Sequence, residues 1–371
     1  NGIRPRLAEL LHANASDIVF LDDASAGLNA VLRSTPWQRG DVLLLTSAAY
    51  ALLPNVARWL EERYGIQTMV AEVAFPCTGD EDFLRPVRQV LNKAAAAGLK
   101  VRLAVFDHVA SYPPVVFPVR ELAELVKLET NGEALVLVDG AHAVGQVPVD
   151  LTYLAAAGVD CYIGNGHKWL MAPHGSGVLW ATPTVQAFLE PAIISSANAG
   201  GTAYQDRFDY IGTRDYTPWC SMGAALDFRK SKLGGEDCVQ KYCVALGRWG
   251  AATLAERFGT EAASPANMTA AMAGVRLPIP LQWSQAKQDE CATTIRAGLM
   301  SNTTSTRMQL VAVALPRKDN PDLKAWWIRV SAQVYLDAED MLALAARIES
   351  LAKTCDTREA HHAADPAALM V

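Results

Sequence analysis

Short apolar runs alternate along the chain with longer stretches in which apolar residues recur at helical spacing. The apolar runs cover residues 18–21, 42–45, 68–75, 101–106, 135–138 and 159–163. Helical patterns cover residues 28–32, 54–64, 80–97 and 119–128. Short buried runs separated by helices are typical of strands in a parallel sheet. The pattern therefore predicts an α/β doubly wound sheet with its active residues at the ends of strands.

A dinucleotide-binding Rossmann domain is the alternative fold with the same alternation. The chain lacks the Rossmann fingerprint, because no GxGxxG follows a strand and GNGHKW at residues 164–169 does not supply one. Beyond residue 246 the pattern changes to strands near 309–315 and 326–332 and a last helix over 338–351. We expect a large domain over residues 1–245, a smaller α+β domain over 246–355, and a loose polar tail over 356–371.

Composition narrows the class of protein. A chain of 371 residues that is 51% hydrophobic can bury a large core, and its net charge of −6 gives no basic footprint for nucleic acid. The 7 cysteines show no CxxC pair and no metal-ligand spacing, which favours reduced thiols in a cytosolic protein. No apolar run reaches the roughly 18 residues that a membrane span needs. Because the chain starts within a helical pattern, we expect an earlier N-terminal segment.

Two neighbouring apolar runs end in residues that carry chemistry. Asp139 ends the first run and His142 follows it, while the second run opens into Asn165-Gly166-His167-Lys168-Trp169. Side chains at the ends of parallel strands converge on one crevice, so a carboxylate, two imidazoles and a lysine can meet there. The alternative is a solvated Asp139 and a surface pair of His167 and Lys168. Either of the two segments taken alone would favour this alternative.

This set of residues suits pyridoxal 5′-phosphate (PLP). The cofactor needs a lysine that condenses with its aldehyde, an acid for its ring nitrogen and a phosphate site. Asp139 would keep the ring nitrogen protonated, and Lys168 would hold the cofactor and move protons at the substrate α-carbon. His142 is expected beside the cofactor, and His167 is expected to reach its phosphate.

The paired segments VDGAHA (residues 138–143) and GNGHKW resemble the class V aminotransferase family of fold-type I PLP enzymes. That family holds cysteine desulfurases, kynureninases, isopenicillin N epimerase and cysteine C–S lyases. The resemblance covers nearly the whole chain and points to the epimerase-like branch, which includes the fungal ergothioneine lyases that cleave hercynylcysteine sulfoxide. It implies a large PLP-binding domain with a mainly parallel, seven-stranded sheet between helices and a smaller C-terminal domain.

The resemblance also assigns a phosphate-binding turn. In the family, backbone amides and a Ser or Thr at the start of a helix bind the phosphate, and this role falls on Ala24, Ser25 and Ala26. Free N–H groups at a helix start are a natural anion site. Judged from the residues alone, Ser25 is equally well explained as a helix cap.

Two further positions are assigned by the family pattern. Tyr50 is expected to stack on the pyridine face, with a half-buried loop tyrosine as the alternative. Ser111, at the end of Asp107-His108-Val109-Ala110-Ser111, is expected at the phenolic oxygen of the cofactor, although Ala110 departs from the family's usual Thr. His108 is expected to be structural.

Two more segments carry roles that the resemblance implies. The family's Gly-Thr-Arg-Asp segment matches residues 212–215, so Thr213 would reach the phosphate of the partner subunit in a homodimer with composite sites, and Arg214 would bind substrate. From the residues alone, a polar surface loop is the preferred interpretation. Arg329 would clamp the substrate carboxylate, because a planar guanidinium suits a carboxylate better than lysine does.

The reaction depends on the fate of the carbanion that forms when Lys168 removes the α-proton. Reprotonation gives epimerisation, loss of a β-substituent gives pyruvate and ammonia, and attack on sulfur by a cysteine gives desulfuration. Cys291 lacks the Gly- or Ser-rich setting of a desulfurase nucleophile. Cys77 lies in a loop that we expect to be exposed, where its thiol could protonate a leaving group, with Tyr50 as the second candidate. The alternative for Cys77 is a small buried hydrophobe.

We therefore expect a PLP-dependent C–S lyase that acts on a small-molecule S-substituted cysteine, such as the ergothioneine precursor sulfoxide. An amino-acid epimerase of the isopenicillin N type and a cysteine desulfurase are the alternative enzymes. A cofactor-binding scaffold without activity is the alternative outside enzymes, and the presence of Lys168, Asp139 and Arg329 together disfavours it.

Overall fold

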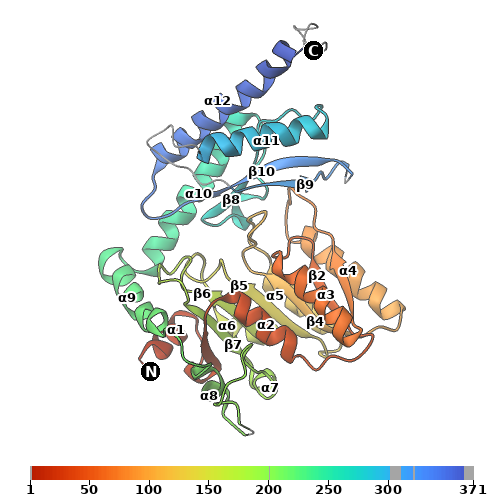
Figure 1. Cartoon of the computed structure of the whole chain (residues 1–371), viewed down its shortest axis with the longest axis vertical. Coiled ribbons are helices and arrows are strands. Elements are labelled where there is room, and N and C mark those ends of the chain that lie inside the picture. The colour runs from red at the N-terminus through yellow and green to blue at the C-terminus, as the bar shows by residue number, and fades with distance from the viewer. Residues whose placement is uncertain (1, 200, 301–310, 321, 363–371) are drawn as a thin grey trace, which may run out of the picture. The chain divides into compact units, whose positions relative to one another are not determined.

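The computed structural model describes residues 2–199, 201–300, 311–320 and 322–362 (Figure 1). The chain divides into two compact units. The first contains residues 1–73, 79–111 and 116–241, and the second contains residues 74–78, 112–115 and 242–371. Two short loop segments of the first half of the chain thus join the second unit, which the hydrophobic pattern does not indicate.

The first unit is built on a seven-stranded sheet in the order β1-β7-β6-β5-β4-β2-β3. The strands are β1 (Ile18–Leu21), β2 (Val42–Thr46), β3 (Gln67–Ala71), β4 (Val101–Asp107), β5 (Leu135–Gly140), β6 (Cys161–Asn165) and β7 (Gly177–Ala181). Strands β2 to β6 pair in parallel, β7 is antiparallel to β6, and β1 is antiparallel to β7. The predicted fold class is confirmed, whereas β7 is a strand that the sequence pattern missed.

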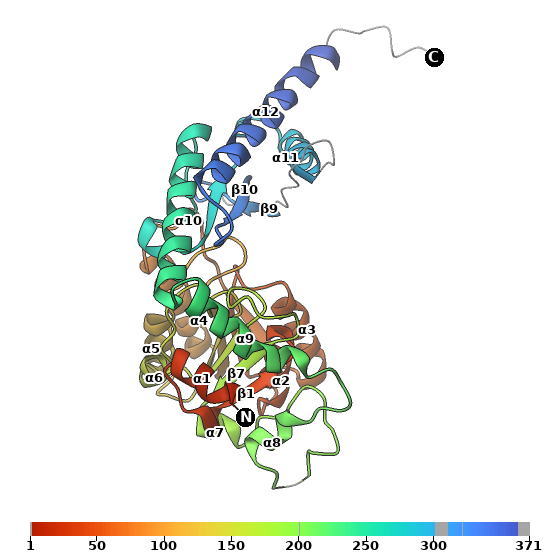
Figure 2. The ribbon, with the colours of Figure 1, turned by 90° about the vertical axis from the view of Figure 1, so that its left-hand side faces the viewer.

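Helices cover both faces of this sheet. They are α1 (Ile3–Leu10), α2 (Ala24–Ser34), α3 (Leu52–Tyr64), α4 (Glu81–Ala96), α5 (Val119–Glu129), α6 (Leu151–Ala156), α7 (Pro183–Gln186), α8 (Tyr204–Asp209) and α9 (Thr217–Lys232), with a short 3-10 turn at Ala15–Asp17. Figure 2 shows α2 and α3 on one side of the sheet and α5 and α6 on the other. The middle strands are therefore buried on both faces, which is why they are continuous apolar runs.

The second unit has a three-stranded antiparallel sheet in the order β8-β10-β9. Its strands are β8 (Met272–Arg276), β9 (Val311–Pro316) and β10 (Lys324–Ser331), and its helices are α10 (Glu236–Phe258), which begins in the first unit, α11 (Gln285–Met300) and α12 (Ala338–His362), with a 3-10 turn at Ala266–Met268. Residues 309–310 of one predicted strand lie outside the described residues. Helix α12 continues to His362, so the tail expected from residue 356 is helical at its start. Within the described residues, no helix has the length and apolar character to span a membrane.

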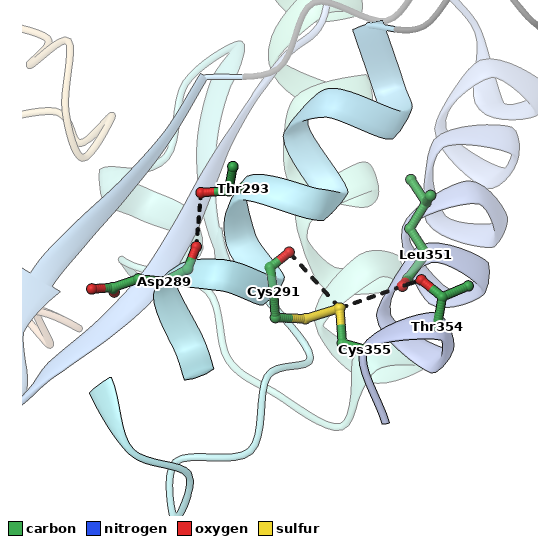
Figure 3. Close-up of a disulfide and its surroundings, with 6 residues drawn as sticks. All are labelled: Asp289, Cys291, Thr293, Leu351, Thr354 and Cys355. Atoms are coloured by element: carbon green, nitrogen blue, oxygen red, sulfur yellow. Dashed lines mark hydrogen bonds between the residues drawn. A yellow bond between two sulfur atoms is a disulfide. The ribbon is translucent and has the colours of Figure 1, made fainter. Parts of the chain in front are cut away.

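A disulfide joins two helices of the second unit. Cys291 of α11 and Cys355 of α12 are 64 residues apart in sequence, and their Cα atoms are 5.6 Å apart (Figure 3). Both residues are buried, at 3% and 9% exposure. The expectation of reduced thiols throughout was therefore wrong for this pair, because the spacing of two cysteines says nothing about which helices pack together.

Candidate active site

A cavity of about 200 Å³ lies in the first unit, at the carboxyl ends of the central strands and the N-terminus of α2. Most of the side chains that the sequence assigns to the cofactor line it. These are Ala24, Ser25, Tyr50, Ser111, Asp139, His142, His167 and Lys168. Residues from five separate segments meet here because parallel strands end at the same edge of the sheet.

Two buried carboxylates lie side by side at the base of this cavity. Asp107 at the end of β4 and Asp139 on β5 are register partners, and each residue is 4% exposed. Asp139 Oδ1 accepts the N–H of Ala141 at 2.9 Å, whereas Asp107 Oδ2 is buried and has no hydrogen-bond partner among the described residues. Burial raises the pKa of both carboxyl groups, and the neighbouring Asp139 raises the pKa of Asp107 further. A cationic group in the cavity would lower the free-energy cost of ionising these two carboxyl groups.

Lysine and imidazole meet across the same cavity. Lys168, in the turn that follows β6, places Nζ 3.0 Å from Nε2 of His142. Trp169, the next residue, donates its indole N–H to Nδ1 of the same imidazole at 3.5 Å. The predicted carboxylate, lysine and imidazole therefore do converge.

The N-terminus of α2 differs from the expectation in its details. The cap is Asp23, whose Oδ1 accepts the N–H of Ala26 at 2.8 Å, so the assignment of Ser25 as a cap was wrong. The N–H of Ala24 donates to Oδ1 of Asn165, also at 2.8 Å. Two of the three backbone amides expected to bind phosphate are therefore engaged within the chain. Ser25 lies in the first helical turn and lines the cavity.

His167 lines the cavity near this helix start. Its Nδ1 accepts the N–H of Ser176 at 3.4 Å, and its ring lies 5.4 Å from that of His174. Burial, and after it the neighbouring His174 and Lys168, lower the pKa of His167. In a neutral imidazole whose Nδ1 accepts a hydrogen bond, Nε2 carries the proton and is a donor, which suits an anion.

The segment expected to serve a partner subunit lies outside this cavity. Arg214 forms an ion pair with Asp22 and lies over the ring of Trp219 at 4.7 Å. Its proposed contact with a substrate stays a prediction. Thr213 is exposed. Its proposed contact with the phosphate of a second subunit stays a prediction.

Two predicted site residues belong to the second unit. Cys77 is only 3% exposed, and its N–H donates to the carbonyl of Ala263 at 2.9 Å, so the expectation of an exposed thiol was wrong. Its proposed role as a proton donor stays a prediction. Arg329 of β10 lies over the ring of Tyr112 at 5.3 Å, and burial lowers its pKa.

His108 has no place in the cavity lining. It is buried, its Nδ1 lies 2.8 Å from the hydroxyl of Tyr162, and burial lowers its pKa from 6.5 to about 4. These contacts fit the structural role expected for it. Among the polar residues of the lining, sequence reasoning missed Asp23, Asp107 and Asn165. A signal existed for each, because Asp107 and Asn165 end strands and Asp23 directly precedes a helix.

The residues present fit PLP. The unpartnered oxygen of Asp107 beside Asp139 suits a protonated ring nitrogen, and Lys168 suits an aldehyde. A phosphate would meet the Ser25 hydroxyl and His167 beside the start of α2, where the N–H groups of Ala24 and Ala26 are already engaged within the chain. The carboxylate of Asp23 also lines the cavity, and its Oδ1 accepts the N–H of Ala26.

Comparisons with known proteins agree with this arrangement. The aminotransferase class-V family model matches residues 1–344. An L-cysteine desulfhydrase-like protein of Epichloe uncinata is 26% identical over 90% of this chain and 79% of its own. A hercynylcysteine sulfoxide lyase of Schizosaccharomyces pombe is 28% identical over 74% of this chain and 69% of its own. An isopenicillin N epimerase of Streptomyces clavuligerus is 27% identical over 94% and 83%.

Solved structures share the fold. The cystine C–S lyase C-DES, solved in complex with its product cysteine persulfide, superposes with a TM-score of 0.69 at 21% identity and covers 93% of this chain and 84% of that chain. A cysteine desulfurase from Thermococcus onnurineus superposes with a TM-score of 0.70 at 18% identity and covers 95% and 83%. At these identities the likeness establishes the architecture only.

Proposed function

Because the chain belongs to the aminotransferase class-V family, we propose that it is a PLP-dependent carbon–sulfur lyase. It would cleave an S-substituted cysteine to a sulfur product, pyruvate and ammonia. The observation that supports the proposal is the cavity in which Lys168 faces the buried pair of Asp107 and Asp139.

Bound PLP supplies an electron sink for the α-carbon of an amino acid. The chain's own residues then have separate tasks. Lys168 Nζ removes the α-proton and can return it. Asp139, with Asp107 beside it, holds a proton at the ring nitrogen in a site where both carboxyl pKa values are raised by burial. Arg329 is the residue proposed to bind the substrate carboxylate through its planar guanidinium.

The sulfur chemistry distinguishes this proposal from a desulfurase. A desulfurase needs a cysteine that attacks the substrate sulfur as a thiolate. Cys291, in the C-terminal part of the chain, is buried and lies in the disulfide with Cys355, so it cannot serve this role while oxidised. Elimination requires no such cysteine, and relatives with desulfhydrase and sulfoxide lyase names support it.

The proposed substrate is a cysteine sulfoxide of the hercynylcysteine type, as in the last step of ergothioneine formation. The proposed assembly is a homodimer in which Thr213 reaches the phosphate held by the other subunit, which requires Thr213 to be accessible, as it is in the single chain. Such a dimer would carry two composite sites.

The decisive experiment offers the enzyme three substrates in parallel: cysteine, hercynylcysteine sulfoxide and a penicillin-type peptide. Pyruvate, sulfide and the configuration of the recovered α-carbon are measured for each. Pyruvate release from a cysteine substrate supports the lyase. Inversion of the peptide without pyruvate would refute it in favour of an epimerase, and protein-bound persulfide without pyruvate would refute it in favour of a desulfurase.

Two variants at the cavity and one outside it control this assay. Lys168→Ala should lose both the visible absorption of bound cofactor and turnover. Asp139→Asn should retain some cofactor but lose several kcal/mol of transition-state stabilisation, because electrostatic terms dominate such steps. Arg88→Met, at an exposed position of α4, should change neither the absorption of bound cofactor nor turnover.

A further inference from the structure

The imidazole of His142 is held between two consecutive residues. Lys168 Nζ lies 3.0 Å from Nε2, and the indole nitrogen of Trp169 lies 3.5 Å from Nδ1 with its hydrogen directed at the ring. Adjacent residues in one turn thus contact the two opposite nitrogens of the same ring. One residue of this trio, Trp169, has no part in the cofactor chemistry described above.

The two contacts together favour one placement of the protons. An indole N–H can only donate, so Nδ1 of His142 must present its lone pair. A neutral imidazole carries its single proton on the other nitrogen, so Nε2 is an N–H donor. That donor faces Lys168, and an ammonium group has no lone pair to accept it. Both hydrogen bonds can form together only when the lysine is a neutral amine.

The fold fixes Trp169 in the position that these two hydrogen bonds need. Trp169 is 7% exposed, and its backbone carbonyl accepts a hydrogen bond from Nη1 of the fully buried Arg229 at 2.7 Å. Gly145, at φ +85°, packs against the backbone of Trp169, where an added Cβ would come within 2.8 Å of the carbonyl carbon. The backbone of Trp169 is therefore held in place, and its side chain is buried.

We propose that Trp169 is a positioning residue that favours neutral His142 as the Nε2–H tautomer and, through it, shifts Lys168 toward the neutral amine. The neutral amine is the form of lysine that can attack a carbonyl carbon or accept a proton. This benefit to catalysis rests on the proposed function, whereas the tautomer does not.

Other charged groups around Lys168 act on the same equilibrium. Asp107 and Asp139 at the strand ends favour an ammonium, and His167 opposes it when protonated. Burial raises the pKa of both carboxyl groups, which weakens their pull on a proton at Lys168. The hydrogen bond from His142 acts on the same equilibrium and shifts it toward the amine.

The test reads the tautomer directly in the full chain without cofactor or substrate. Histidine labelled with ¹⁵N is observed by long-range ¹H–¹⁵N correlation at one fixed pH, and a His142→Gln spectrum assigns the signal among the 7 histidines. The wild type should show a protonated Nε2 and an unprotonated Nδ1. A protonated Nδ1, alone or with Nε2, overturns the proposal without any variant.

Trp169→Phe keeps an aromatic ring and removes the N–H. It should shift His142 toward the Nδ1–H form and slow modification of Lys168 by an amine-specific reagent, mapped by peptide mass, by about three- to tenfold, as expected for the loss of one hydrogen bond. Trp219→Phe is the matched control, because Trp219 is 6% exposed and donates its indole N–H to the carbonyl of Leu21 instead.

The outcomes separate cleanly. An unchanged tautomer in Trp169→Phe overturns the role of the indole, and a changed tautomer with unchanged lysine reactivity overturns the link to Lys168. An equal shift in Trp219→Phe overturns the specificity of the effect. Both readouts, the tautomer of His142 and the reactivity of Lys168, are independent of substrate, so a failed lyase assay would refute the proposed function and leave the tautomer assignment intact.

Discussion

Replacing Arg229 tests how the active-site turn is held. Arg229 of α9 is completely buried, and its Nε and Nη2 each lie 2.5 Å from a carboxylate oxygen of Glu236. Its Nη1 donates to the carbonyl of Trp169 at 2.7 Å, and its Nη2 donates to the carbonyl of Gly145 at 3.0 Å. Arg229→Met keeps an apolar side chain of similar reach and removes all of these donors.

The expected loss of stability follows from burial. Breaking a buried ion pair by removing one partner costs about 3–5 kcal/mol. The Glu236 side chain is 25% exposed, so water can partly solvate its carboxylate and moderate this cost. The carbonyls of Trp169 and Gly145 also lose charged donors, each worth about 1.5–3 kcal/mol in its own right. These terms overlap and are not summed, so we expect a total of about 4 kcal/mol.

Urea unfolding of the full chain, followed by tryptophan fluorescence, measures this loss. Arg88→Met is the control, because Arg88 makes only a 3.9 Å surface contact with Glu81 and should cost at most about 1 kcal/mol. Arg229→Lys should remain impaired, since an ammonium cannot reproduce the guanidinium fork. Cofactor affinity should fall as well, because Trp169 directly follows Lys168. A loss below about 1 kcal/mol in Arg229→Met would refute the proposed anchoring of the turn.

The remaining predictions concern other parts of the chain. Burial lowers the pKa of His108 from 6.5 to about 4, so the unfolded chain binds a proton that the folded chain does not. The free energy of unfolding should therefore fall by about 3 kcal/mol as the pH drops from 6.5 to about 4. Unfolding curves of His108→Gln should lack this dependence on pH. The disulfide of Cys291 and Cys355 closes a 64-residue loop and should contribute about 4 kcal/mol to the free energy of unfolding. A reductant should lower the melting temperature of the wild type to that of Cys291→Ser. An unchanged melting temperature in reductant would contradict the presence of the disulfide. Thr213→Ala should weaken cofactor retention without changing secondary structure, and a fully active monomer by light scattering would exclude the composite site. Cys77→Ala should slow elimination by about 10²–10⁴-fold while α-proton exchange with deuterated solvent continues; elimination at the wild-type rate would leave Cys77 as a packing residue.

The sequence by itself determined the fold class and the central chemistry. Strands buried on both faces must be continuous apolar runs, so their positions and parallel arrangement are visible in the hydrophobic pattern. Parallel strands end at one edge, so the residues after two such runs, Asp139 and Lys168, were predicted to meet and do share one cavity. The linear order of the chain was sufficient for these conclusions.

Tertiary structure decided whatever depends on register and on packing between distant segments. Asp107 became the partner of Asp139 only through the β4–β5 register, which a pattern of apolar residues does not specify. Asp23 rather than Ser25 caps α2, because the backbone dihedral angles at the helix start select the cap. Cys291 met Cys355 because two helices pack together, and the buried Arg229 of α9 met Trp169 because that helix packs against the turn after β6. Such contacts leave no local periodicity in the sequence, so only the folded chain shows them.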